Sequence, residues 1–90
     1  MPRQSIVREW FFMTPDKETT HEFTKEKKLF LCGRTYNNSD YDPMTTEFHD
    51  GHRIATSFIV DMKDNVVITR SGSLYTLDGP PNEDPDRFFL

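Results

Sequence analysis

Residues 51–77 have the sequence GHRIATSFIVDMKDNVVITRSGSLYTL, in which three short apolar segments alternate with two turns. The segments span 53–62, 65–70 and 74–77, and they are rich in the β-branched and aromatic residues that strands favour. The intervening sequences KDN and SGS are typical of tight turns. This stretch therefore predicts a three-stranded meander and, with it, a small and mostly β domain.

The first of these segments alternates between apolar and polar residues, as expected of a half-buried strand. One face has Thr56 together with four apolar residues, which are Ile54, Phe58, Val60 and Met62. The other face has Arg53, Ser57 and Asp61. We therefore expect the four apolar side chains to face the core.

An earlier strand is predicted over 6–13, where the sequence IVREWFFM is apolar on both faces. Trp10 and Phe12 share one face of this strand, and Phe11 and Met13 share the other. We expect both faces to be covered, as in the wall of a barrel or at a dimer contact.

Another strand is predicted over 28–36. Leu29 and Leu31 lie on one face of this strand, and Phe30, Cys32 and Tyr36 lie on the other. Gly33 lies within it and indicates a bulge or a sharp bend, which small barrels need at their corners.

The connecting segments are less regular. Residues 14–28 are polar and fit a hairpin with an arm over 19–23, with a short helix capped by Thr14 as the close alternative. Residues 37–47 form a long polar loop. Residues 78–86 contain three prolines and four acidic residues, which argues against a strand or a helix.

Together these segments predict an all-β fold: a five- to six-stranded SH3-like or partly open barrel with a C-terminal three-stranded meander and an irregular tail. We expect a single small β domain over 1–79 and an acidic, Pro-rich tail over 80–90. A chain of 90 residues has a thin core, so a homodimer is compatible with the sequence.

Charge and cysteine content limit the function classes. The net charge is −4, made up of +2 over 1–36 and −6 over 37–90, which suits a basic partner better than a nucleic acid. An acidic surface that only maintains solubility is the favoured alternative. Cys32 is the single cysteine, so no internal disulfide forms. No secretory signal or membrane-spanning segment is predicted, and we expect a cytoplasmic location.

No catalytic constellation is present, so we expect no enzymatic activity and no cofactor. Cys32 lies in an apolar strand and is expected to be a buried thiol rather than a nucleophile. His49 and His52 flank an Asp-Gly turn, and we expect them to bind no metal. A small metal-binding domain or enzyme at these two histidines remains the third alternative.

The preferred hypothesis is a non-enzymatic protein-interaction module that regulates or inhibits a protein partner of unknown identity. Its expected contact residues are the loop aromatic Tyr41, its neighbours Asp40 and Asp42, and the tail residues Phe88 and Phe89. For the two tail residues, an apolar anchor for a partner and a cap folded back onto the barrel are equally compatible with the sequence.

The second hypothesis is a small barrel that binds single-stranded nucleic acid. Aromatic residues would stack on bases and cations would contact phosphates. The candidates are Trp10, Tyr36, Arg8, Arg34, Lys27 and Lys28.

One further motif is the hairpin tip SGS at 71–73, which follows Arg70. Its hydroxyls and amides could bind a phosphate or a peptide carboxylate. A hairpin turn that simply needs glycine is the favoured alternative.

Overall fold

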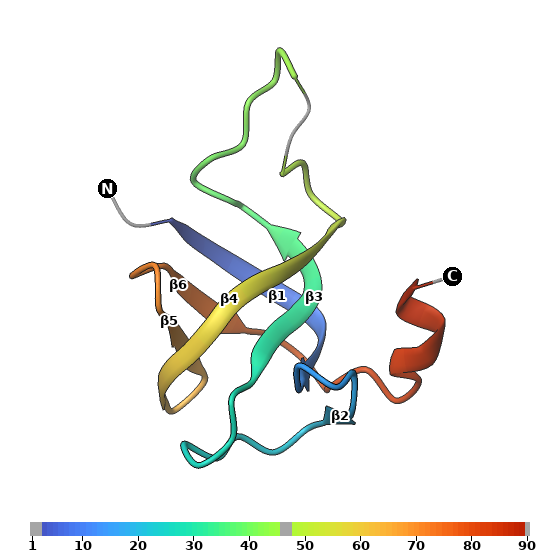
Figure 1. The fold of residues 1–90 in the computed structure, drawn as a ribbon. Coiled ribbons are helices and arrows are strands. Elements are labelled where there is room, and N and C mark those ends of the chain that lie inside the picture. Colours follow the sequence, from blue (N-terminus) through green and yellow to red (C-terminus); the bar gives the residue numbers. More distant parts are fainter. Residues whose placement is uncertain (1–2, 46–47, 90) are drawn as a thin grey trace.

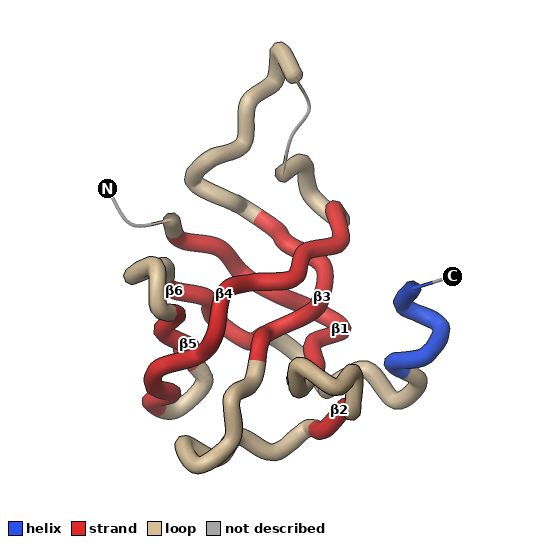
Figure 2. Tube along the Cα trace, viewed as in Figure 1, coloured by secondary structure: helices blue, strands red, loops and turns tan. Residues whose placement is uncertain are grey.

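The computed structural model describes residues 3–45 and 48–89, with only the backbone of Phe89. Within them lie six strands and one 3₁₀ helix (Figures 1 and 2). The elements are β1 (Gln4–Met13), β2 (Thr19–Thr20), β3 (Phe30–Tyr36), β4 (His52–Lys63), β5 (Val66–Thr69), β6 (Leu74–Leu77) and the 3₁₀ helix η1 (Pro85–Phe89). None of the described helical segments is long and apolar enough to cross a membrane.

The strands form one sheet in the order β2-β1-β3-β4-β5-β6, with antiparallel neighbours. A parallel pairing of β1 with β6 closes a ring of five strands, while β2 extends it as a short flap. The long β4 pairs with β3 through its first half and with β5 through its second half. The prediction of an all-β fold with a small, partly closed barrel and a C-terminal meander is confirmed.

Both faces of β1 are covered, as its sequence predicts. Phe12 and Val7 join the main core, against which Trp10 packs. On the other side, Phe11 and Met13 belong to a smaller cluster. That cluster also contains Cys32 of β3 and Phe88 of η1, so the C-terminal segment covers the outside of the barrel wall.

A bulge bends β1 at Glu9, which has a φ of 53°. The pairing with β3 shifts register between Arg8 and Phe11, directly opposite Gly33. A Cβ at Gly33 would lie 2.4 Å from Cγ1 of Val7 and 2.9 Å from the backbone O of Arg8. The irregularity predicted at Gly33 therefore exists, but the bulged residue is on the neighbouring strand and glycine allows the two strands to approach.

The expectation that Val60 faces the core is wrong. Its side chain is 51% exposed, whereas the adjacent Ile59 is buried. The alternation reverses before Val60, where the register of β4 against β3 shifts between Ala55 and Phe58, so that Ile59 joins the core. Val60 lies at a second shift, between Ile59 and Asp61 against β5.

Residues 14–28 form the hairpin rather than the helix. Thr19 and Thr20 of β2 pair with the end of β1, although the arm is shorter than the predicted 19–23. Thr14 belongs to the turn, where its hydroxyl accepts a 3.1 Å hydrogen bond from the N–H of Glu18.

The C-terminal segment differs from the expectation of an irregular chain at one place. η1 begins at Pro85, inside the stretch predicted to have neither strand nor helix. Proline is well suited to the first position of a helical turn, because its φ is already helical and its missing N–H donor would have no partner there.

Candidate functional site

The loop at 37–51 links β3 to β4 and projects beyond the end of the barrel (Figures 1 and 2). Its sequence contains four acidic residues and neither lysine nor arginine. This loop is therefore a negatively charged extension, which we call the acidic loop.

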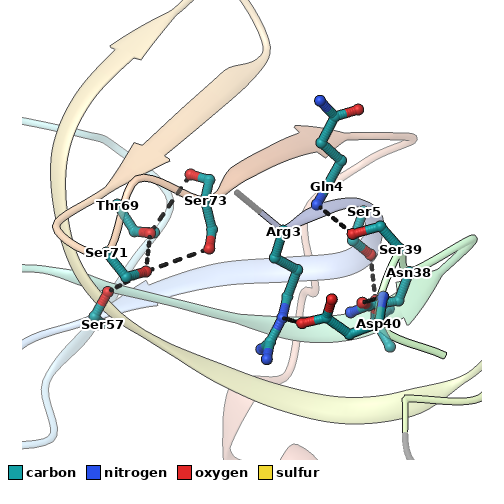
Figure 3. A network of polar contacts seen from close by, with 11 residues as sticks. Arg3, Gln4, Ser5, Asn38, Ser39, Asp40, Ser57, Thr69, Ser71 and Ser73 are labelled. Carbon is teal, nitrogen blue, oxygen red and sulfur yellow. Dashed lines mark hydrogen bonds and ion pairs between the residues drawn. The ribbon is translucent and has the colours of Figure 1, made fainter. Parts of the chain in front are cut away.

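The first residues of the acidic loop are fixed to β1 and β3 by hydrogen bonds (Figure 3). Asn38 is 5% exposed; its amide donates to the hydroxyl of Thr35 at 3.1 Å, and its Oδ1 accepts from the N–H of Asp40 at 2.9 Å. Ser39 exchanges two bonds with Gln4, both 2.9 Å long. The loop therefore leaves the barrel in a defined direction.

Arg3 and Asp50 hold the loop further. Nε of Arg3 lies 2.7 Å from Oδ2 of Asp40, and its guanidinium lies 4.2 Å from the centre of the Phe48 ring. Although partial burial lowers the pKa of Arg3, its contacts with Asp40 and Tyr75 outweigh this effect and the pKa is raised. The carboxylate of Asp50 accepts a 2.9 Å bond from the N–H of Asn37 and so joins the two ends of the loop.

Farther from the barrel, the acidic loop exposes two large apolar side chains. Tyr41 is 48% exposed and Met44 is 90% exposed. Met44 donates its N–H to the carboxylate of Asp42 at 2.9 Å, which turns the chain at the tip. A cavity of about 540 Å³ lies beside Tyr41 and is also lined by His49. Tyr41 was predicted from the sequence, but Met44 was missed. The sequence signal for Met44 was a large apolar residue directly after Pro43 in a polar loop.

The predicted partner-binding residues do not form one site. Asp40, Tyr41 and Asp42 are together in the acidic loop, although Asp40 is engaged by Arg3. Phe88 is only 8% exposed and its ring packs edge-on against Phe11 at 5.2 Å. Figure 1 shows η1 well away from the acidic loop. The structure therefore adopts the folded-back arrangement of Phe88; the side chain of Phe89 lies outside the described part.

The nucleic-acid candidates are also divided between places. Arg8 lies 4.7 Å from the centre of the Tyr36 ring and is 2.8 Å from Asp78. Its neighbour Arg34 is 2.7 Å from Glu9. Both arginines of this group are thus partly neutralised by carboxylates, and Arg8 occupies a face of Tyr36 on which a base would stack.

The remaining candidates lie elsewhere. Trp10 packs against Phe12 at 5.6 Å, and its indole N–H donates to the backbone O of Gly79 at 3.1 Å. Lys27 and Lys28 precede the start of β3, where Lys28 lies near the ring of Phe58. The six residues therefore do not line a continuous cationic groove with a free aromatic face.

His49 and His52 contact each other, with ring centres 5.3 Å apart. In the described ranges, no group of three His, Cys, Asp or Glu side chains is placed to hold a metal ion. Cys32 is fully buried, and this burial raises the pKa of its thiol to about 11. Such a thiol is protonated near neutral pH and is a poor nucleophile.

Comparison of the chain with protein-family models, curated protein sequences and solved structures finds no significant match. The geometry of the acidic loop is thus the main guide to function.

Proposed function

We propose that the protein is a non-enzymatic binding module that attaches to a protein partner through the acidic loop and regulates or inhibits it. The observation that supports this function is the exposure of Tyr41 and Met44 on a loop whose base is pinned to the barrel. We assign the contact to Tyr41, Met44 and Asp42.

The physical argument concerns the cost of ordering a loop on binding. Bonds from Asn38 and Ser39 already fix the base, so fewer residues lose freedom when the tip docks. Tyrosine is enriched among the residues that dominate binding energy, and methionine adapts its shape to irregular apolar pockets. The loop therefore combines an ordered base with side chains suited to an interface.

The charge of the loop specifies the partner's chemistry. Because Asp40 is already paired with Arg3, Asp42 is the acidic residue at the tip best placed to meet a cation. We expect the partner to offer an apolar pocket bordered by lysine or arginine. Such charge complementarity mainly raises the association rate, so salt should slow association more than it speeds dissociation.

The test uses a photo-crosslinking amino acid at Met44, with a second protein carrying the same amino acid at Val60 as the control. Val60 is also a large exposed apolar residue, but it lies on β4 outside the acidic loop. We expect a host protein to crosslink from position 44 and not from position 60. Equal crosslinking from both positions would contradict the assignment.

The purified partner is then titrated with wild-type protein and single variants. Tyr41→Ala and Met44→Ala should each weaken binding about tenfold or more, as expected for central contact residues, whereas Val60→Ala should leave it unchanged. Unaltered affinity of both loop variants would refute the site. Deletion of residues 80–90 is unsuitable as a control, because Phe88 covers the outer cluster on the barrel wall.

A further inference from the structure

A second cavity, of about 370 Å³, lies on the side of the barrel where β4 lacks a second neighbour. The pairing of β4 with β5 begins only at Ile59, so the described first half of β4 is paired with β3 alone. The cavity lies between this half of β4, the turn connecting β5 to β6, Phe48 of the acidic loop, and Arg3, which directly precedes β1. We call it the β4 cavity.

The lining of the β4 cavity is cationic, in a protein with a net charge of −4. Arg3 and Arg53 contribute to it, and none of the described residues that line it is acidic, although Asp40 pairs with Arg3 from outside the lining. The guanidinium of Arg53 donates to the backbone O of Phe88 at 2.6 Å, so its bonding is directed to η1. Arg3 is paired with Asp40 through Nε, and its terminal N–H groups are therefore the donors of this lining that can contact an anion.

Hydroxyl groups line the same cavity. Ser57 of β4 and Ser71 of the β5–β6 turn approach each other at 3.4 Å, and Ser71 also lies 3.1 Å from Thr69 and 3.3 Å from Ser73 (Figure 3). These distances exceed the usual 2.5–3.0 Å of a bond between hydroxyls. Because such bonds are weak, Ser57 and Ser71 can turn toward a ligand at little cost.

Arg3 lines the same cavity as these hydroxyls. Figure 3 shows it between the serine network and Asp40. Asp40 contacts Nε, which is one of the five N–H donors of a guanidinium, and Phe48 supports one of its planes. The head group is thus oriented by the protein before any ligand arrives.

We propose that the β4 cavity binds the phosphate group of a small phosphorylated molecule through Arg3, Ser57 and Ser71. A phosphate monoester has three terminal oxygens that accept several strong hydrogen bonds, and its negative charge suits the guanidinium of Arg3. The cavity has the size of small-molecule sites, which span roughly 300–1,000 Å³. Its ligands differ from the partner contacts proposed at Tyr41, Asp42 and Met44, and the proposal does not depend on that contact.

The test is a titration of ¹⁵N-labelled full-length protein with inorganic phosphate and phenyl phosphate, followed by amide chemical shifts. We expect saturable shifts at Ser57 and Ser71 with both compounds, and tighter binding of phenyl phosphate if the remainder of the cavity accepts the organic group. Acetate at the same concentration and ionic strength should produce no saturable shift. Equal saturable responses to acetate and phosphate, or no saturation with any of them, would overturn the proposal.

Matched variants separate the loss of a cation from the loss of an ion pair. Arg3→Gln and Asp40→Asn both remove the Arg3–Asp40 charge pair, but only the first removes the proposed phosphate ligand. In Asp40→Asn the amide oxygen can still accept the hydrogen bond from Nε that orients Arg3. We expect Arg3→Gln to weaken binding about tenfold or more, and Asp40→Asn to retain or improve it. If both variants lose binding equally, the effect belongs to the ion pair and the proposal fails.

Two further variants test whether a loss of phosphate binding is specific to the site or comes from a change in the fold or in the net charge. Ser71→Ala removes an exposed hydroxyl and should weaken phosphate binding severalfold while the spectrum stays that of the folded protein. Arg87→Gln changes the net charge as Arg3→Gln does, but Arg87 lies in η1 beside Asp84 and should not alter binding. A loss of affinity in Arg87→Gln, or none in Ser71→Ala, would count against the site.

Discussion

Replacement of Gly33 by alanine tests how closely β1 and β3 approach at the bulge. The added Cβ would lie 2.4 Å from Cγ1 of Val7 and 2.9 Å from the backbone O of Arg8. Val7 is fully buried, and its branched side chain is stiff about χ1, so it cannot easily rotate away. The substitution should therefore strain the junction of the two strands.

The expected magnitude follows from two opposing effects. Overpacking a buried site costs about 1–3 kcal/mol, whereas replacing glycine in a strand restores roughly 0.5–1 kcal/mol by restricting the unfolded chain. The contact with the backbone of Arg8 leaves little room for relaxation, so we expect Gly33→Ala to lower the free energy of unfolding by about 1–2 kcal/mol.

Urea unfolding of wild type, Gly33→Ala, Val7→Ala and the double variant measures this effect by linear extrapolation. Removing Cγ1 of Val7 takes away the nearest clashing atom, so the double variant should lose about 1 kcal/mol less than the sum of the single variants. A Gly33→Ala protein as stable as wild type would refute the close approach. Additive losses would show that Val7 is not the clashing group.

Three further outcomes are expected. Phe88→Ala should lower the free energy of unfolding in urea by about 2–3 kcal/mol. This loss is smaller than for a phenylalanine at the centre of the core, because η1 can detach locally. No loss would mean that η1 does not cover Phe11. Asn38→Ala should cost about 1–3 kcal/mol and speed hydrogen exchange at Asp40, and unchanged exchange would contradict the pinned loop base. Burial raises the pKa of Cys32 from 9.0 to about 11 on folding. The contribution of the buried neutral thiol to the free energy of unfolding is therefore fully present below pH 9 and is lost as the pH rises through 11. Stability should therefore fall by roughly 1.4 kcal/mol per pH unit in this window, and a Cys32→Ala protein with the same slope would exclude this cause.

The meander at 51–77 was predictable because its signals are local. Alternation of apolar residues and the turn sequences KDN and SGS are properties of neighbouring residues, and the strands β4, β5 and β6 follow them closely. The exception is Val60, whose exposure depends on a bulge that forms where β4 changes partner from β3 to β5. A change of partner is a property of the closed sheet and has no local sequence signal.

The candidate site was predictable only in part. Polar composition placed Tyr41 in an exposed loop, but the pinning of that loop required Gln4 and Arg3, which are more than thirty positions away in sequence. The position of Phe88 was not predictable either, because it depends on contacts with residues far away in sequence. The same C-terminal sequence can form an extended anchor for a partner or a cap folded back onto the barrel. The order of residues does not indicate which of the two forms.

The sequence by itself determined the all-β class, the meander, the two covered faces of β1 and the acidic character of the second half. Only the tertiary structure decided that Phe88 covers the barrel wall and that Arg3, Ser57 and Ser71 line one cavity. The physical reason is that the formation of a strand, and which of its faces is apolar, depend on side chains only a few residues apart. A cavity, in contrast, is assembled from segments far apart in the chain, which the pairing of β1 with β6 brings together in the closed ring.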